Sequence, residues 1–319
     1  MNPLTGAYGT ASALRNFLFD RGLLSAHRLQ RPVVSVGNLS VGGAGKTPFV
    51  IALGGLLKAR GVPFDVLSRG YGRRTRGVLI VDPQGSAADF GDEPLLIARR
   101  LQVPVVVGES RYQAGLVAES RFPSRLHILD DGFQHRSLAR DFDIVLVTPH
   151  DFEDHLLPSG RLREPLSALT RADAVVLPAN LAADSAAAGH FALKGKPIWR
   201  MRRDVSLSAP PQRPVCFCGI ARPGLFFTQV RACSVVPAAE LVFRDHHRYS
   251  DRDIAQLLDE RDQCGGDGFI TTEKDAINLG SLREQLNPLS VANLKVTLED
   301  PADIIDTILG RVEVDKPGS

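Results

Sequence analysis

A loop at residues 40–47, SVGGAGKT, contains the residue types that bind the phosphates of a nucleotide. Its glycines allow backbone N–H groups to surround an anion without interference from a Cβ atom. The lysine would reach the outer phosphates, and the threonine hydroxyl would bind Mg²⁺. The usual pattern begins with glycine, but a serine holds that place here. The predicted nucleotide-binding residues are Ser40, Val41, Gly42, Gly43, Ala44, Gly45, Lys46 and Thr47.

The chain on either side of this loop has the pattern of the elements that would hold it. Residues 32–36 are apolar and rich in β-branched side chains, which is typical of a buried parallel strand. From residue 48 to about residue 60 the pattern is helical. A strand, a glycine loop and a helix in this order favour a phosphate site, because the helix N-terminus adds the positive end of its dipole. A glycine-rich turn with an exposed lysine is the alternative.

Two pairs of adjacent carboxylates follow the loop in the sequence. Residues 126–131, LHILDD, predict a buried strand that ends in carboxylates, which is where folds with a phosphate loop hold their metal ion. Mg²⁺ takes few protein ligands, so Asp130 or Asp131 would bind it directly or through water, together with Thr47. Asp92 and Glu93 precede a predicted helix, and alone such a pair indicates only a favourable interaction with the helix dipole.

Other polar side chains lie beyond the ends of predicted strands. Arg69 and Tyr71 follow the strand at residues 64–67, at the edge where parallel sheets bind ligands. Gln134 and His135 come just after the acidic strand end and would face the same edge. Ordinary tight turns with solvated side chains are the alternative.

Two later segments also carry groups that could do chemistry. Arg163 could bind phosphate oxygens with its guanidinium fork, or it could be a solvated loop residue. His246 lies beside Asp245 after a predicted strand, and a histidine next to an aspartate can transfer protons near neutral pH. Surface histidines are the alternative there. Residues 271–275, TTEKD, resemble a guanine-reading Lys-x-Asp motif but lack its spacing, so guanine specificity is not predicted.

The composition excludes several classes of protein. The 319 residues are 44% hydrophobic and 23% charged, as in an ordinary soluble globular protein. A formal charge of +2, without a basic stripe that contains aromatic residues, predicts no nucleic-acid partner, and no protein partner is evident. No apolar run reaches the roughly 18–20 residues of a spanning helix. The 4 cysteines lack zinc-site spacing and are expected to be reduced thiols.

Residues 1–30 have a distinct pattern. Apolar side chains recur at about helical spacing, arginines lie between them, and the first acidic residue is Asp20. A basic amphipathic helix suits an anionic membrane surface, and packing on the protein's own core is the alternative.

The alternation of predicted strands and helices indicates an α/β fold, with a P-loop NTPase-like parallel sheet flanked by helices. The proline-rich segment at residues 206–214 marks a candidate boundary. We therefore predict a membrane-associating segment at residues 1–30, a P-loop core at residues 31–205 and a smaller α/β domain at residues 206–319.

Together these motifs resemble those of one family, the tetraacyldisaccharide 4′-kinases of lipid A biosynthesis in Gram-negative bacteria. No single motif beyond the phosphate loop would suffice, but the ordered set is specific. Serine at position 40 fits the family, whereas Arg248 departs from the proline that is common there. The motifs are GNLSVGGAGKTP (37–48), LSRGYGR (67–73), GDEP (91–94), DDGFQH (130–135), GRLREP (160–165), FRDHHRYS (243–250) and TTEKDAINL (271–279).

The resemblance implies a reaction and a location. An enzyme of this family would use ATP and Mg²⁺ to phosphorylate the 4′-hydroxyl of a tetraacylated glucosamine disaccharide 1-phosphate. It would be a peripheral protein on the cytoplasmic face of the bacterial inner membrane, with a smaller C-terminal domain that closes over the active site.

The resemblance also implies roles for individual residues. Asp92 is the implied general base, paired with His246 from the smaller domain. Glu93 joins Asp130 and Asp131 in the implied acidic set that binds the metal. The predicted substrate or phosphate contacts are Arg69, Tyr71, Gln134, His135, Arg163 and Glu164.

Two other functions are compatible with a phosphate loop. One is a P-loop NTPase that acts as a conformational switch at the membrane without a phosphoryl acceptor. The other is a membrane-docked nucleotide-binding module without turnover, which would leave the carboxylates near the loop unexplained. Phosphorylated lipid formed in the presence of ATP distinguishes a kinase from both.

Overall fold

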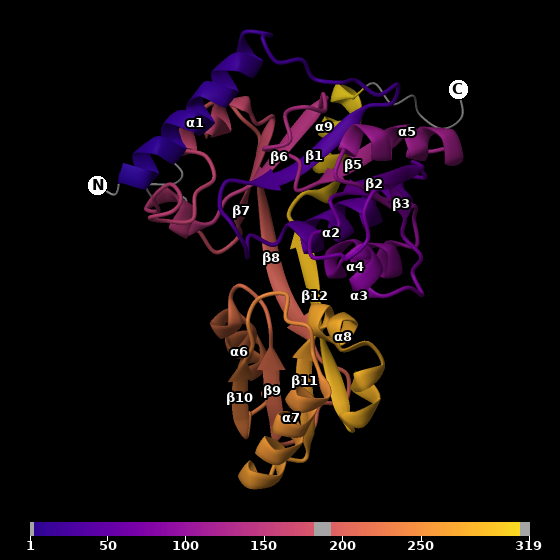
Figure 1. Ribbon diagram of the computed structural model, residues 1–319, viewed down its shortest axis with the longest axis vertical. Coiled ribbons are helices and arrows are strands. Elements are labelled where there is room, and N and C mark those ends of the chain that lie inside the picture. Colours follow the sequence, from indigo (N-terminus) through magenta and orange to yellow (C-terminus); the bar gives the residue numbers. More distant parts are fainter. Residues whose placement is uncertain (1–2, 182–192, 313–319) are drawn as a thin grey trace.

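The computed structural model describes residues 3–181 and 193–312, and the predicted α/β class is confirmed (Figure 1). In the described residues, twelve strands form one sheet in the order β10-β9-β11-β12-β8-β7-β6-β1-β5-β2-β4-β3. The predicted first and last segments include residues 1–2 and 313–319, which lie outside the described residues.

The strand that leads into the phosphate loop lies in the middle of a parallel block. β1 pairs with β5 on one side and with β6 on the other, in parallel in both cases. Every residue of β1 is buried, as expected where helices cover both faces of a parallel sheet. β3 (Leu79–Ile80) adds an antiparallel edge next to β4. The parallel strands are β1 (Val33–Asn38), β2 (Phe64–Ser68), β4 (Val105–Val107), β5 (Leu126–Asp130), β6 (Phe142–Leu146) and β7 (Ala174–Pro178).

Helices cover both faces of this block. α2 (Lys46–Ala59), α4 (Asp92–Leu101) and α9 (Pro301–Arg311) pack on one face, and α5 (Arg111–Arg121) packs on the other. The short α3 (Ala87–Phe90) comes just before α4. The 3₁₀ helices η1 (Pro149–Phe152), η2 (Leu166–Arg171) and η4 (Gly280–Gln285) lie in the connections.

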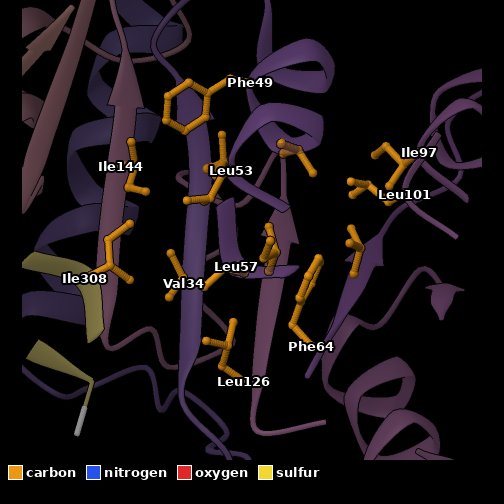
Figure 2. Packing of buried hydrophobic residues seen from close by; sticks show 14 of the residues in the cluster. Val34, Phe49, Leu53, Leu57, Phe64, Ile97, Leu101, Leu126, Ile144 and Ile308 are labelled. Atoms are coloured by element: carbon orange, nitrogen blue, oxygen red, sulfur yellow. The ribbon is translucent and has the colours of Figure 1, made fainter. Parts of the chain in front are cut away.

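An apolar stripe on α2 fixes this helix over the sheet. Phe49, Leu53 and Leu57 are four residues apart, which places them on one face of the helix. Each is at most 1% exposed. All three belong to one buried cluster, and Figure 2 shows Leu57 nearest to Val34 of β1 and Leu126 of β5. This packing holds the first turn of α2, and with it the phosphate loop, at the edge of the sheet.

Two neighbouring glycines in α2 provide a test of this packing. A Cβ atom at Gly54 would lie 2.6 Å from Cδ1 of Leu101 and 2.9 Å from Cζ of Phe64, whereas nothing lies within 4 Å of a Cβ atom at Gly55. Gly55→Ala is expected to raise the free energy of unfolding by about 1 kcal/mol through helix propensity. Gly54→Ala is expected to lower it, because overpacking a core costs about 1–3 kcal/mol. Urea unfolding measures both, and equal stabilisation by the two would contradict the packing described.

The C-terminal part of the chain continues the same sheet. β9 lies between β10 and β11, and β11 pairs with β12, all in parallel. Figure 1 shows these strands below the parallel block, with α6, α7 and α8 beside them. The elements are β9 (Pro214–Cys218), α6 (Pro223–Ala232), β10 (Ala239–Val242), α7 (Asp251–Cys264), β11 (Gly268–Thr272), α8 (Glu273–Leu279) and β12 (Leu289–Leu298).

β8 (Ile198–Ser206) is absent from the sequence prediction, although it joins the two parts of the sheet. It pairs in parallel with β7 and antiparallel with β12. Its sequence, IWRMRRDVS, carries charged side chains that obscure the alternation of the buried Trp199 and Met201 with exposed residues. The predicted division after residue 205 falls at the end of this strand. The sheet continues from β8 into β12 without a break, and the division into domains stays a prediction.

α1 (Pro3–Asp20) lies on the surface of the parallel block, and none of its residues is buried. Leu4, Leu14 and Phe17 are 64%, 56% and 49% exposed. The helix is attached through polar groups, including an ion pair of 2.6 Å between Asp20 and Arg136. Among the described helices, none combines the length and the apolar character that crossing a membrane requires.

Candidate active site

The loop at residues 40–47 has the backbone of an anion-binding cradle. Gly42, Gly43 and Gly45 have φ angles of 72°, 59° and 87°, which residues with a Cβ atom rarely adopt. α2 begins directly after the last of these glycines, so its free N–H groups face the loop. The Oγ atom of the buried Ser40 has no hydrogen-bond partner among the described residues. These features fit a bound phosphate.

A cluster of alternating charge lies beside this loop. Nζ of Lys46 lies 3.4 Å from Oδ1 of Asp131 and donates to Oδ1 of Asn38 at 2.9 Å. The guanidinium of Arg163 donates to both oxygens of Asp131, at 2.8 and 3.0 Å. Burial acts against the charge of Asp131, but Lys46 and Arg163 outweigh it and hold the pKa of this carboxyl well below its ordinary range. The cluster therefore presents ionised groups where the phosphates would bind.

Asp130 has a different environment from that of its neighbour. It is buried at the end of β5, where its Oδ2 atom accepts from Oγ of Ser68 at 3.1 Å and its Oδ1 atom has no partner among the described residues. Burial raises the pKa of Asp130 to about 7, and the charges of Glu93 and Asp131 add to this shift. A metal ion would favour the charged form and satisfy the free oxygen, so the site fits Mg²⁺. Thr47, another of the predicted metal ligands, is buried in the first turn of α2.

The acidic group is too small to hold a metal by itself. Among residues 3–181 and 193–312, no group of three or more His, Cys, Asp or Glu side chains is arranged to bind a metal ion. Mg²⁺ at phosphoryl-transfer sites takes one or two carboxylates together with phosphate oxygens and water. The arrangement therefore suits a metal that arrives with a nucleotide.

Asp92 and His246 lie far apart in the sequence but meet in space. Nδ1 of His246 lies 2.9 Å from Oδ2 of Asp92. Nδ2 of Asn278 donates to the same oxygen at 3.2 Å, and Nζ of Lys274 lies 3.7 Å from it. Burial acts against the charge of Asp92, but His246 and Lys274 lower its pKa to about 2. The hydrogen bond to Asp92 raises the pKa of His246 above its ordinary value, so the two groups form an ion pair while the imidazole is protonated.

The backbone positions both members of this pair. Asp92 is the first residue of α4, at the carboxyl-end edge of the sheet. His246 has a φ angle of 55°, which is rare for a residue other than glycine, and its N–H donates to the carbonyl of Gly219 at 3.1 Å. The ring of Tyr71, one of the predicted contact residues, lies 5.2 Å from the imidazole between centroids.

The other predicted contact residues are spread along the same edge. Nε2 of Gln134 donates to the carbonyl of Asn38 at 2.9 Å, beside the charged cluster. Glu164 is buried and forms an ion pair of 2.6 Å with Arg171. Arg69 is exposed after β2 and forms no hydrogen bond or ion pair with a described residue. The structure thus brings Gln134 and Glu164 to the neighbourhood of the loop but gives Arg69 no fixed partner in the described part of the chain.

The surroundings of His135 favour the neutral form of its imidazole. Burial lowers its pKa to about 4, and the positive charges of Arg111 and Arg140 add to the effect.

In an NMR titration, the ring of His135 is expected to stay neutral down to about pH 4. The signal of this ring is the one that disappears in the His135→Gln variant. Because the unfolded chain takes up this proton near pH 6.5, the free energy of unfolding should fall between about pH 6.5 and pH 4. A midpoint near 6.5 for His135 in the folded protein would contradict this environment.

Three residues of the site were not predicted. Asn38 accepts hydrogen bonds from Lys46 and Arg163 at the end of β1. Lys274 and Asn278 both reach the Asp92 carboxylate from α8, where a separation of four residues places them on one helix face. Lys274 also forms an ion pair of 3.1 Å with Glu93. Helical spacing within the motif at residues 271–279 was the available signal, but this short helix was not predicted.

Comparison with known proteins gives matches over nearly the whole chain. The sequence model of one family, described as tetraacyldisaccharide-1-P 4′-kinase, matches residues 1–313. A tetraacyldisaccharide 4′-kinase of Koribacter versatilis is 49% identical over 98% of this chain and 99% of its own, and one of Aquifex aeolicus is 38% identical over 93% of both. A crystal structure of the "apo" form of the Aquifex aeolicus protein in complex with ATP aligns with a TM-score of 0.78, at 37% identity and over 97% of each chain.

A glycine loop at the centre of a parallel sheet, with carboxylates at the adjacent strand end, defines a P-loop nucleotide-binding protein. The matches over nearly the whole length make the assignment specific. The chain belongs to the tetraacyldisaccharide 4′-kinase family, and the predicted resemblance is confirmed. The alternative of an NTPase switch without a phosphoryl acceptor is not supported.

Proposed function

We propose that the protein transfers the γ-phosphate of ATP to the 4′-hydroxyl of a tetraacylated glucosamine disaccharide 1-phosphate. The match of a family of this activity over residues 1–313 is the observation that carries the proposal. The glycine cradle beside Lys46 and the acidic strand end beside it support ATP and Mg²⁺ as the groups that bind there.

Asp92 is proposed to accept the proton of the attacking sugar hydroxyl. The new bond joins the sugar oxygen to the γ-phosphorus, the bond from this phosphorus to the β,γ-bridging oxygen breaks, and ADP leaves. With a pKa of about 2, Asp92 is a weak base. A loose transition state requires little proton removal, so orientation by Asp92 and charge neutralisation by Lys46 would account for most of the rate. His246 would hold Asp92 in place, because its ring nitrogen binds the carboxylate.

Thr47, Glu93, Asp130 and Asp131 are the residues proposed to hold Mg²⁺. The free Oδ1 atom of the buried Asp130 supports this proposal. When bound, Mg²⁺ neutralises charge on the β- and γ-phosphates. The two aspartates differ in how readily they ionise in the absence of the metal. Asp131 is held ionised, whereas burial favours the neutral form of Asp130.

The acceptor is proposed to lie beside α1, where this helix contacts the segment at Arg163 and Glu164 next to Asp131. Two contacts support this placement. The hydroxyl of Tyr8 donates to the carbonyl of Arg163 at 3.0 Å, and Nδ2 of Asn16 donates to Glu164 at 3.0 Å. A lipid whose acyl chains follow the exposed apolar side chains of α1 would therefore bring its sugar toward these residues.

The same helix supports a peripheral location on the cytoplasmic face of the inner membrane. Its exposed Leu14 and Phe17 lie near Arg15 and Arg21, as in helices that lie in an anionic membrane surface.

Replacing both Leu14 and Phe17 with serine is expected to lower partitioning onto vesicles of anionic phospholipid about tenfold or more, since each side chain buried in the membrane contributes about 1.5–3 kcal/mol. The control is Val236→Ser, which changes a 75% exposed apolar residue in the C-terminal part. Equal partitioning of the two variants would contradict a membrane role for α1.

The activity is tested with ATP labelled in its γ-phosphate and the lipid disaccharide 1-phosphate in mixed micelles. Label on the 4′-position of the lipid is expected, in an amount equal to the ADP formed. Release of labelled inorganic phosphate without labelled lipid would contradict the proposal.

A further inference from the structure

Two arginines outside the predicted site lie against the phosphate loop. Arg203 is part of β8, and Arg222 immediately precedes α6. A Cβ atom at Gly43 would lie 2.7 Å from Nε of Arg222, and a Cβ atom at Gly45 would lie 2.9 Å from Nη1 of Arg203. Each guanidinium therefore reaches a different glycine of the cradle. In Figure 1 the loop between β1 and α2 lies on the side of the parallel block that faces the C-terminal part.

Neither guanidinium has a carboxylate partner among the described residues. Nη2 of Arg222 reaches Oγ1 of Thr148 at 3.5 Å, the outer limit of a hydrogen bond. The side chain of Arg203 forms no hydrogen bond or ion pair with a described residue, although it is partly buried. Burial lowers the pKa of Arg203, and the positive charge of Arg222 adds to this effect. Two partly buried cations that lie close to each other and form no ion pair with a described residue favour the binding of an anion.

The neighbouring arginine on the same strand behaves as an ordinary surface residue. The side chain of Arg202 is 68% exposed and pairs with Asp204 at 3.1 Å. Successive residues of a strand point to opposite faces, so Arg203 faces the same side as the buried Trp199 and Met201. The absence of a partner at Arg203 thus follows from its place beside the loop and not from a general excess of arginine on β8.

Arg222 also lines a cavity next to the loop. This cavity has a volume of about 420 Å³ and lies between Ser40, Asp151, Arg161 and Arg222. Its lining includes Ser40, which begins the phosphate loop, so a ligand on the loop has access to the guanidinium. The preceding residue, Ala221, also packs on the loop. A Cβ atom added at Gly42 would lie 3.0 Å from the Cβ atom of Ala221.

We propose that Arg203 and Arg222 bind the phosphate groups of ATP together with Lys46, so that the chain beyond β7 completes the polyphosphate site. This inference rests on the proposed nucleotide site at residues 40–47. A guanidinium fork matches the geometry of phosphate oxygens, and its charge is permanent. Because adenosine lacks phosphates, the two arginines would contribute to the binding of ATP and ADP but not to that of adenosine.

The test replaces each arginine with methionine, which keeps most of the side-chain length but removes the charge. The control is Arg202→Met on the opposite face of β8. Competition against a fluorescent ATP analogue gives the affinities of ATP, ADP and adenosine. Arg203→Met and Arg222→Met are each expected to weaken ATP about tenfold to a hundredfold, to change adenosine less than about twofold and to reduce the salt dependence of ATP binding. Arg202→Met should leave all three affinities unchanged.

Two results would overturn the inference: unchanged ATP affinity in both variants, or an equal loss for ATP and adenosine. If a methionine variant unfolds at lower urea concentration than the wild type, the lysine substitution at that position replaces it. Lysine keeps the charge without the fork, and an intermediate loss of ATP affinity is expected. A wild-type protein that binds no nucleotide would instead contradict the proposed function, whereas tight ATP binding that is insensitive to both arginines contradicts this inference alone.

Discussion

Lys46→Ala is expected to lower kcat for lipid phosphorylation about a thousandfold or more. Lys46 is the cation at the end of the glycine cradle, and its Nζ atom lies within 3.4 Å of Asp131. Charge develops on the transferring phosphoryl group and the leaving ADP, and a preorganised donor at such a site is worth about 10²–10³ in rate even when it is a single neutral group. A charged donor placed at the outer phosphates is expected to contribute at least as much.

The measurement is steady-state formation of labelled lipid at saturating ATP. Lys58→Ala is the control, since Lys58 lies on the same helix and its Nζ atom donates to the carbonyl of Leu101 at 2.8 Å and to no other residue that the structure describes. That variant should keep nearly all activity. If Lys46→Ala retained more than about a tenth of the wild-type kcat, the role given to this residue in charge neutralisation would be wrong.

Most of the sheet could be predicted from the sequence, because its strands are short apolar runs bounded by glycine, proline or charge. β1, β5 and β6 are buried on both faces, so each is a mainly apolar run in the sequence, and runs of 5 or 6 residues are too short for a helix. β8 could not be predicted, because one face of it is charged and its pairing with β12 becomes apparent only in the folded chain. α8 is a single short helix of 7 residues, too brief for its periodicity to stand out.

The site was predictable where its residues adjoin one another in sequence. The loop at residues 40–47 and the carboxylates at residues 130–131 each follow a recognisable strand, and both lie at one edge of the sheet. Contacts across long separations carry no such local signal. The approach of Arg203 and Arg222 to the glycines depends on how β8 and α6 are placed, and neither residue lies in a motif. The meeting of Asp92 with His246 came from the family resemblance alone, and their roles stay a proposal.

The Asp92–His246 contact has an expected signature in stability. The hydrogen bond to Asp92 raises the pKa of His246, whereas the pKa of Asp92 is about 2, so this carboxyl stays ionised from neutral to alkaline pH. A histidine with a raised folded-state pKa contributes stability that is fully present below its unfolded pKa of about 6.5 and is lost as pH rises through the folded value. Urea unfolding of wild type, Asp92→Asn, His246→Ala and the double variant should therefore give a larger coupling energy near pH 6 than near pH 9.

The same four proteins test whether the pair acts as one unit in catalysis. Asp92→Asn and His246→Ala are each expected to lower kcat about 10²–10⁴-fold with little change in KM for the lipid, because positioned acid–base groups act in the transition state. If His246 works through Asp92, the double variant should be about as slow as the slower single variant, since removal of either residue already disables the unit. Multiplication of the two defects would show that the residues act independently.

Asn278→Ala is the control variant. It removes a neutral hydrogen bond to Asp92 and no charged group, because the Nδ2 atom of Asn278 donates to the same Oδ2 oxygen at 3.2 Å. A defect in that variant as large as that of His246→Ala would mean that the imidazole contributes no more than a neutral hydrogen bond.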